Sequence, residues 1–271
     1  MSFYTSLTGL NAATAQLGVT ANNVANVSTV GFKESFALAS KTVDVKGDGF
    51  ESRASVAVDS KDIINLMPGV PNQTGRAMDI AMQAATVLGV QADNGEIGFT
   101  RRGDLRVSPT GLIENAAGHL VLGEAGPINI PPGQLVTISP DGTVFGSLPS
   151  EPAVAPIELG KLMLRDASEM PLTRRKDGLF EPIAEQFKGT DFPTGPEIVL
   201  LQSGSLEGSN VNPIEAMIKM MDFSRSYESQ IKMINEIKSI DISRRSSWLR
   251  KNNDARHDCW STLTNRWTGV D

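Results

Sequence analysis

The sequence has few of the residue types on which several common protein classes depend. Its 271 residues include one Cys, two His, two Tyr and three Trp. A single Cys cannot form an intramolecular disulfide, which excludes a disulfide-stabilised mini-domain. The sequence contains no run of about 18 uncharged apolar residues, so it predicts no membrane-spanning helix. The net charge of −6 argues against nucleic-acid binding, because phosphate recognition needs a concentrated basic face.

Charged side chains are absent from the first 32 residues, and the first cation is Lys33. A cleavable signal peptide normally begins with a basic stretch followed by a compact apolar stretch, so the sequence predicts none. We therefore expect the protein either to stay in the cytoplasm or to leave it by a route that recognises an uncleaved N-terminus.

Helical periodicity is confined to the two ends of the sequence. Near the N-terminus, seam positions recur at alternating steps of four and three: Phe3, Leu7, Leu10, Thr14, Leu17, Ala21 and Val24. A matching seam near the other end consists of Ala216, Met220, Phe223, Tyr227, Gln230, Ile234 and Ile237. This spacing is typical of a coiled coil. The helices would pack on each other, on the middle of the chain, or on neighbouring molecules.

The start of the C-terminal helix carries strong local signals. Asn212 can cap the first turn, Pro213 occupies a position where a missing N–H is harmless, and Glu215 can complete a capping box. Further apolar residues widen the stripe on this helix beyond a two-helix seam: Ile214, Met217, Ile218, Met221 and Ile231. This width favours neighbours on more than one side, and hence intermolecular packing.

Residues from about 70 to 200 have the pattern of antiparallel strands. Short β-branched runs alternate with turn signals at residues 93–95, 108–111, 140–142 and 176–178, each of which ends in Gly. No helical pattern of 10 to 15 residues separates the strands, so a parallel sheet is not expected. Residues 34–70 fit either an extended hairpin or a linker.

The predicted fold class is α+β, in which discontinuous N- and C-terminal helices form a coiled coil with an inserted antiparallel β-rich domain. Residues 1–33 and 206–245 would form the terminal domain, residues 34–70 the linker or hairpin, and residues 71–205 the β-rich domain. Residues 246–271 would be an atypical, disordered tail.

The sequence contains no complete set of residues for a catalytic site. His119 lies in a predicted strand, where a structural imidazole is the simpler interpretation. His257 and Cys259 are two possible zinc ligands where a tetrahedral site needs four. We therefore predict no catalytic, cofactor-binding or metal-binding residues, no cofactor and no enzymatic activity.

A basic segment follows one predicted strand. Arg101 and Arg102 face Asp104 and Arg106 across a turn, which is most simply a solvated strand end. The alternative is a buried ion pair at an interface.

Two long motifs carry a family resemblance. The segment TANNVANVSTVGFK at residues 20–33 resembles the N-terminal signature of the bacterial flagellar rod and hook proteins, and LEGSNVNPIEAM at residues 206–217 resembles their C-terminal signature. Weaker likeness runs through residues 75–80, 100–103 and 118–131. The C-terminal form is most similar to that of the proximal rod members. The resemblance covers most of residues 1–239.

The resemblance implies a structural subunit of the basal-body proximal rod, located in the periplasm and part of the drive shaft and the wall of the export channel. Its partners would be other rod subunits, further copies in a helical assembly, and the flagellar type III export apparatus. A secreted β-rich binding or adhesive module, oligomerised by its terminal helices, is the alternative. The assembly interface would comprise Leu7, Leu10, Leu17, Asn22, Asn23, Val24, Asn26, Gly31, Asn210, Asn212, Met217, Met220, Phe223, Tyr227, Ile231 and Ile234.

The Asn residues of the N-terminal signature have two interpretations. Asn22, Asn23 and Asn26 flank the seam, where their amides could bond neighbouring backbones and fix the register, or they could simply end the helix. Gly31 would supply backbone freedom where the chain leaves the helix.

The sequence departs from the family pattern in two places. Residues 83–88 lack the glycines that usually form a turn there. After about residue 239 the sequence becomes rich in Ser, Arg and Trp, and Trp248, Cys259, Trp260 and Trp267 all lie in this part. A replaced or frame-shifted C-terminus and an unusual extension both fit, and we assign this tail no function.

Overall fold

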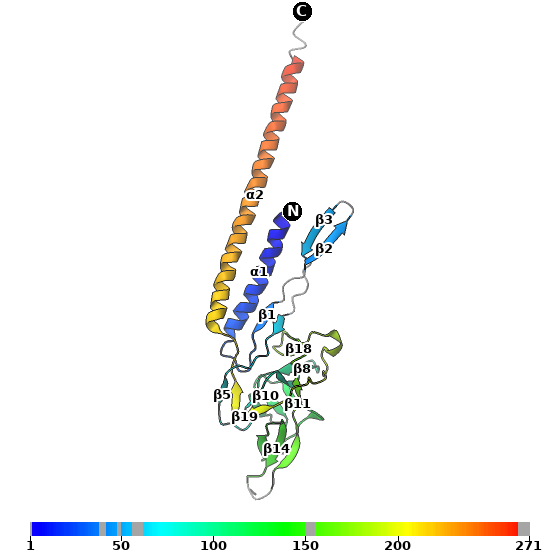
Figure 1. Ribbon diagram of the computed structural model, residues 1–271, viewed down its shortest axis with the longest axis vertical. Helices are drawn as coiled ribbons and strands as arrows, with labels where there is room; N and C mark the ends of the chain where they lie inside the picture. The colour runs from blue at the N-terminus through cyan, green and yellow to red at the C-terminus, as the bar shows by residue number, and fades with distance from the viewer. Residues whose placement is uncertain (1, 38–41, 48–49, 56–61, 150–154, 265–271) are drawn as a thin grey trace, which may run out of the picture. The chain divides into compact units, whose positions relative to one another are not determined.

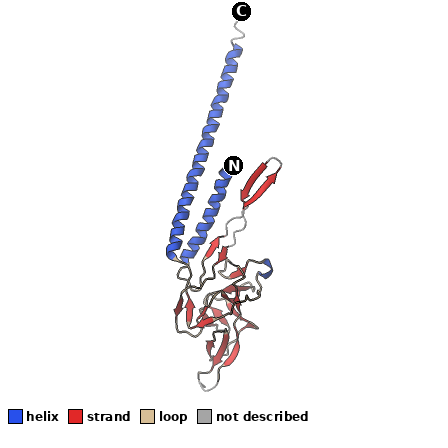
Figure 2. Ribbon diagram, viewed as in Figure 1, coloured by secondary structure: helices blue, strands red, loops and turns tan. Residues whose placement is uncertain are grey.

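The computed structural model describes residues 2–37, 42–47, 50–55, 62–149 and 155–264 (Figure 1). Within these residues one long helix lies at each end of the chain, α1 (Ser2–Ala25) and α2 (Pro213–Thr264). The regular structure between them is β-strand apart from the 3-10 helix η1 (Glu185–Phe187) (Figure 2). The chain divides into two compact units: Met1–Thr14 with Asp222–Asp271, and Ala15–Met221.

The strands are β1 (Ser35–Ala37), β2 (Thr42–Gly47), β3 (Phe50–Ser55), β4 (Asp62–Ile64), β5 (Pro71–Gln73), β6 (Ile80–Met82), β7 (Thr86–Gln91), β8 (Ile97–Thr100), β9 (Leu105–Val107), β10 (Ile113–Asn115), β11 (Leu120–Gly123), β12 (Gly126–Pro127), β13 (Leu135–Ile138), β14 (Thr143–Ser147), β15 (Ile157–Lys161), β16 (Leu164–Asp166), β17 (Leu172–Arg174), β18 (Phe180–Pro182), β19 (Leu201–Ser203) and β20 (Ser205–Glu207).

Every strand pairing in the described residues is antiparallel. The main sheet runs in the order β1-β4-β17-β18-β8-β7-β11-β10-β9, with β12 beside β11 and β16 beside β7. A second sheet has the order β13-β14-β15, and the pairs β6-β19, β5-β20 and β2-β3 complete the set. The pair β2-β3 lies within residues 34–70, for which the sequence predicts either an extended hairpin or a linker, and its antiparallel register is that of a hairpin.

Four hairpins are built on the same glycine-containing turn, as the sequence predicts. Gly95, Gly111, Gly142 and Gly178 have φ values of 85°, 83°, 87° and 85°. Each donates its backbone N–H to the carbonyl three residues earlier, at 2.9 to 3.1 Å. Glycine is favoured here because it adopts a positive φ without a Cβ clash. These turns join β7 to β8, β9 to β10, β13 to β14 and β17 to β18.

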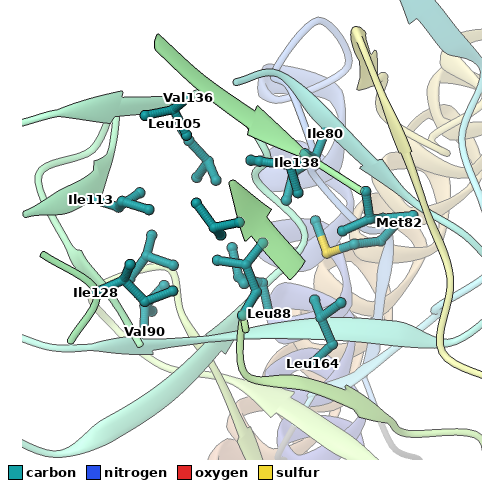
Figure 3. Packing of buried hydrophobic residues seen from close by; sticks show 14 of the residues in the cluster. Ile80, Met82, Leu88, Val90, Leu105, Ile113, Ile128, Val136, Ile138 and Leu164 are labelled. Carbon is teal, nitrogen blue, oxygen red and sulfur yellow. The ribbon is translucent and has the colours of Figure 1, made fainter. Parts of the chain in front are cut away.

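Two apolar clusters form the core of the β-rich part. The first gathers buried residues from both larger sheets, including Leu88, Leu105, Ile113 and Ile138 (Figure 3). The second is centred on Phe99, whose ring packs edge-on against Phe192 at a centroid distance of 4.6 Å. Close packing in these two clusters fixes the positions of the strands, including β8, after which Arg101 follows directly.

The helical part of the fold-class prediction is wrong. The described residues form mostly β-sheet with one helix at each end, and no coiled coil of two long helices around an inserted domain is present in them. In α1 the seam positions Thr14 and Ala21 are exposed, whereas Ala13, Thr20 and Asn23 are buried. The buried face of α1 is therefore offset from the predicted seam. Asn23 lies on the buried face because its side-chain amide is hydrogen-bonded to the backbone of Ser35.

The helix α2 continues through Thr264, across most of the segment for which the sequence predicts a disordered tail. Residues 265–271, including Trp267, lie outside the described residues. The predicted domain boundaries stay a prediction.

Candidate functional site

The site lies within residues 15–221, where both helices meet the β-rich part. We call residues 22–35 the N-terminal junction and residues 206–216 the C-terminal junction. The backbone N–H of Gly31 donates to the carbonyl of Glu207 at 2.8 Å, and that of Glu34 donates to Oδ1 of Asn210 at 2.7 Å. The two family-like motifs, far apart in the sequence, are therefore neighbours in space.

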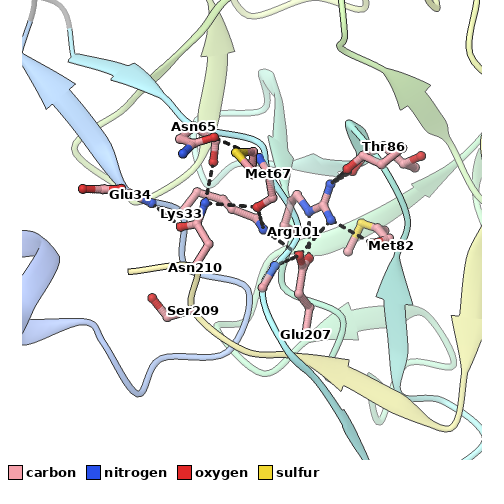
Figure 4. Close-up of polar contacts among 12 residues, drawn as sticks. Lys33, Glu34, Asn65, Met67, Met82, Thr86, Arg101, Glu207, Ser209 and Asn210 are labelled. Atoms are coloured by element: carbon pink, nitrogen blue, oxygen red, sulfur yellow. Dashed lines mark hydrogen bonds and ion pairs between the residues drawn. The ribbon is translucent and has the colours of Figure 1, made fainter. Parts of the chain in front are cut away.

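A buried charge cluster of Lys33, Arg101 and Glu207 lies at the centre of this site (Figure 4). The guanidinium of Arg101 holds the Glu207 carboxylate with two hydrogen bonds, Nε to Oε2 at 2.7 Å and Nη2 to Oε1 at 2.8 Å. Lys33 Nζ contacts the same Oε1 at 2.5 Å. One carboxylate thus serves two cations, and all three side chains are fully or almost fully buried.

Arg101 also fixes the turn between β6 and β7. Its Nη2 donates to the carbonyl of Met82 at 2.7 Å, and its Nη1 donates to those of Ala84 at 2.5 Å and Thr86 at 3.0 Å. This is the turn where the sequence lacks glycines. Ala84 takes a positive φ of 45° and is the one described non-glycine residue that does so.

The interpretation of Arg101 as part of a solvated strand end is wrong, because a carboxylate 106 residues away in the sequence covers it. Arg101 and Glu207 instead form a buried ion pair within the chain. Arg102 pairs with Asp104 at 2.8 Å and Arg106 with Glu114 at 2.7 Å, both with partial exposure.

Lys33 has the most perturbed environment of the cluster. Burial, reinforced by the positive charge of Arg101 and opposed by Glu207, lowers the pKa of Lys33 from 10.5 to about 8. Its Nζ donates a second hydrogen bond to the carbonyl of Met67 at 2.8 Å. Desolvation exceeds the attraction of a carboxylate that is shared with another cation, so the charged ammonium is held there at a cost.

Amide side chains connect the junctions to the strands. Asn23 bonds both backbone groups of Ser35, donating to its carbonyl at 2.9 Å and accepting from its N–H at 3.1 Å. Asn210 donates to the carbonyls of Asn65 and Met67 at 2.9 and 3.0 Å. These are contacts within one chain, and the predicted role of Asn23 and Asn210 in an assembly interface stays a prediction.

The other two signature asparagines lie at the end of α1. Asn22 is exposed, and its carbonyl accepts a hydrogen bond from Asn26 Nδ2 at 2.9 Å. Asn26 Oδ1 accepts from the hydroxyl of Thr29 at 3.2 Å. The Asn22 carbonyl also accepts the backbone N–H of Asn26 at 3.2 Å, so the Asn26 side chain adds a second hydrogen bond to a carbonyl of the last helical turn.

Gly31 is required by its conformation and by its neighbour. Its φ is 67°, and a Cβ at this position would overlap the backbone carbonyl of Arg101. The predicted need for a glycine where the chain leaves the helix is confirmed, with close approach to the β-rich part as a second reason.

An apolar contact joins the junctions beside the charge cluster. Phe32 packs with Val211 and Ala216, and Val24 lies against them. The guanidinium of Arg174 stacks over the Phe32 ring at 3.9 Å and donates to the carbonyl of Lys33. Burial, opposed by Asp62, lowers the pKa of Arg174 to about 10. Sequence reasoning missed Arg174, since no local pattern marks it.

The predicted start of the C-terminal helix and its cap by Asn212 are confirmed, but the predicted capping box is not formed, because the Glu215 side chain pairs with Lys219 and not with the backbone N–H of Asn212. Oδ1 of Asn212 accepts from the backbone N–H groups of Ile214 and Glu215 at 3.1 and 3.4 Å. The carboxylate of Glu215 pairs with Lys219 at 2.8 Å, and the same ammonium lies 3.5 Å from Glu34 of the N-terminal junction.

The remaining predicted interface residues differ in exposure. Met217, Tyr227 and Ile231 are exposed. Half-buried side chains are Leu10, Leu17, Val24, Met220, Phe223 and Ile234. The side chain of Leu7 lies outside the described residues. An interface made by these residues stays a prediction.

The described residues contain no group of three or more His, Cys, Asp and Glu placed to hold a metal ion. Nor is any described helix long and apolar enough to cross a membrane. The charge cluster holds no activated nucleophile, and its groups are engaged with one another. What this arrangement can do is fix two chain segments on a rigid β-rich support.

Three family models match the chain. The flagella basal body rod protein model matches residues 3–33, the flagellar hook protein FlgE/F/G D1 domain model residues 82–146, and the flagellar basal body rod FlgEFG protein C-terminal model residues 202–241. Each match contains one member of the charge cluster: Lys33, Arg101 and Glu207 respectively.

Whole-chain relatives agree with these matches. The flagellar basal-body rod protein FlgF of Salmonella typhimurium is 37% identical over 238 residues, which are 87% of this chain and 93% of the relative. FlgF of Escherichia coli is 36% identical over 241 residues, with the same two coverages. FlgF of Caulobacter vibrioides is 30% identical over 84% of this chain and 89% of the relative. The chain therefore belongs to the flagellar basal-body rod proteins, in the FlgF group, and is a structural subunit of the flagellar rod.

Proposed function

We propose that this subunit builds the proximal part of the periplasmic rod, where it packs against other rod subunits and further copies of itself in a helical array and forms part of the export-channel wall. It reaches that place through the flagellar export apparatus and catalyses no reaction. Family membership supports the rod; the partners and the route are the proposal.

The observation that carries the proposed packing is an apolar face on the first turns of α2. Ile214, Met217, Ile218 and Met221 follow a helical spacing on one side and are between 49% and 70% exposed. Two turns of helix that expose four large apolar side chains mark an interaction surface. The sequence pattern that favours neighbours on more than one side is thus matched by side chains that remain uncovered.

The charge-free N-terminal segment supports the export route. Its 32 residues before Lys33 include no charged side chain and no long apolar run. Such a segment is weakly helical in isolation, because helices gain most of their stability from packing. It can therefore pass unfolded through a narrow channel and become ordered on assembly.

The alternative function, a secreted β-rich adhesive module, is not favoured, because the relatives named above are rod proteins over nearly their whole length.

Motility complementation tests the proposed packing surface. In a bacterium that lacks its own FlgF-type gene, the parent chain should restore swimming and Met217→Asp should not. As a control, Leu135→Asp places the same charge at a comparably exposed position on β13 and should complement. Both variants should fold like the parent. Normal swimming with Met217→Asp would contradict an interface at this face.

A further inference from the structure

The charge cluster is unbalanced, and this imbalance has a structural consequence. Lys33 and Arg101 supply two buried positive charges against the single negative charge of Glu207. Both cations contact Oε1 of that carboxylate, at 2.5 and 2.8 Å, so they also lie close to each other. Two cations buried this close repel strongly unless an anion lies between them.

The three residues come from three separate parts of the chain (Figure 4). Arg101 directly follows β8 and is held by the carbonyls of Met82, Ala84 and Thr86 in addition to Glu207. Those carbonyls belong to the β-rich part, so Arg101 remains in place when the junctions leave. Lys33 belongs to the N-terminal junction, and Glu207, the last residue of β20, lies at the start of the C-terminal junction, which docks through the pairing of β20 with β5.

This arrangement gives the two cations different roles. When the N-terminal junction is undocked, the Lys33 ammonium is hydrated and carries no desolvation penalty. Docking that junction without Glu207 would bury an ammonium beside a guanidinium with no counter-charge, which is strongly unfavourable. With Glu207 in place, the same docking adds two hydrogen bonds to Lys33 Nζ.

We propose that Lys33, Arg101 and Glu207 form a charge lock that allows the N-terminal junction to dock only when the C-terminal junction is docked. The lock couples the base of α1 to the base of α2, although the two contacting residues are 174 positions apart. The charge of Lys33 makes docking depend on Glu207, because an N-terminal junction with an apolar residue at position 33 would dock without that carboxylate. This inference does not depend on the rod function.

The lock affects the order in which the two junctions fold when the chain emerges from its N-terminus. Any process that presents the chain from its N-terminus exposes residues 22–35 long before residue 207. Until then Lys33 keeps the N-terminal junction undocked, and the closing contact comes from the segment that opens α2. A subunit would therefore order its two ends together, near the end of its delivery.

Hydrogen exchange of the full chain tests the lock. The amides of residues 23–35 are followed in the parent, Glu207→Gln, Lys33→Met and the double variant, with β14 as an internal reference. Glu207→Gln keeps the size of the side chain and should raise exchange of the N-terminal junction about a hundredfold or more. Glu114→Gln removes an exposed pair with Arg106 and serves as the matched control, with no change expected.

The double variant separates a lock from simple packing. With Lys33→Met present, Glu207→Gln should raise exchange of residues 23–35 less than tenfold, because a single buried cation then remains and three carbonyls solvate it. If Glu207→Gln alone unfolds the whole chain, refolding by the added Lys33→Met gives the same support. An unchanged junction in Glu207→Gln, or a double variant as exposed as Glu207→Gln alone, would overturn the proposal.

Discussion

Replacing Lys33 by Met should preserve or increase stability, although it removes the buried ammonium. Because one pH unit between the pKa values of about 8 and 10.5 corresponds to about 1.4 kcal/mol, keeping Lys33 charged at pH 7 costs about 3 kcal/mol. The substitution leaves no acceptor without a donor. The Met67 carbonyl keeps Asn210 at 3.0 Å, and Glu207 keeps Arg101 and the N–H of Gly69 at 2.8 Å.

The net expectation for Lys33→Met at pH 7 is a free energy of unfolding between the parent value and about 2 kcal/mol above it, after an allowance of about 1 kcal/mol for the lost hydrogen bonds. Urea denaturation followed by far-ultraviolet circular dichroism measures this difference.

The same substitution changes the pH dependence. Between pH 8 and 10.5 the unfolded chain still binds a proton at Lys33 that the folded chain has released, so the parent gains stability as pH rises through this range. Below about pH 8 both states are protonated and the full cost is present. Lys33→Met should lack this rise. A variant more than about 2 kcal/mol less stable than the parent at pH 7, or one with an unchanged pH profile, would show that burial of the Lys33 ammonium does not carry this cost.

Three further substitutions, one of them with a matched control, test individual elements by chemical denaturation. Gly31→Ala forces a Cβ into a backbone carbonyl at positive φ and should cost at least about 3 kcal/mol, whereas Gly75→Ala, with φ of 74° and open space around it, should cost about 1 kcal/mol; equal costs would remove the close approach as the reason. Ala84→Gly relieves a positive φ of 45° and should stabilise by up to about 1 kcal/mol, and a loss of stability would show that the turn is not strained. Asn212→Ala removes the cap of α2 and should cost about 1 kcal/mol, while no change would mean that solvent caps the helix equally well.

Local chemistry made much of the β-rich part predictable. The turns at Gly95, Gly111, Gly142 and Gly178 were identifiable because a glycine at positive φ is a requirement of the turn itself. The cap at Asn212 was identifiable for a similar reason, since its partners are the next few backbone N–H groups. Such features need no knowledge of the rest of the fold.

Interactions between distant segments were not predictable in this way. The helical seam assigned Thr14 and Ala21 to the buried side, but burial followed Asn23, whose partner is the backbone of Ser35. Similarly, Arg101 has the local pattern of an exposed strand end, and only Glu207 makes its burial possible. A useful signal was nevertheless present, because Lys33, Arg101 and Glu207 all lie in segments that resemble the same family.

A rod subunit must be present in purified rods. Mass spectrometry of basal bodies, purified from complemented cells and stripped of hook and filament, measures whether this chain is among their components. We predict peptides of this chain in the rod-containing particles, and their loss together with swimming in Met217→Asp. Swimming cells whose purified rods contain no peptide of this chain would show that it is not a rod subunit.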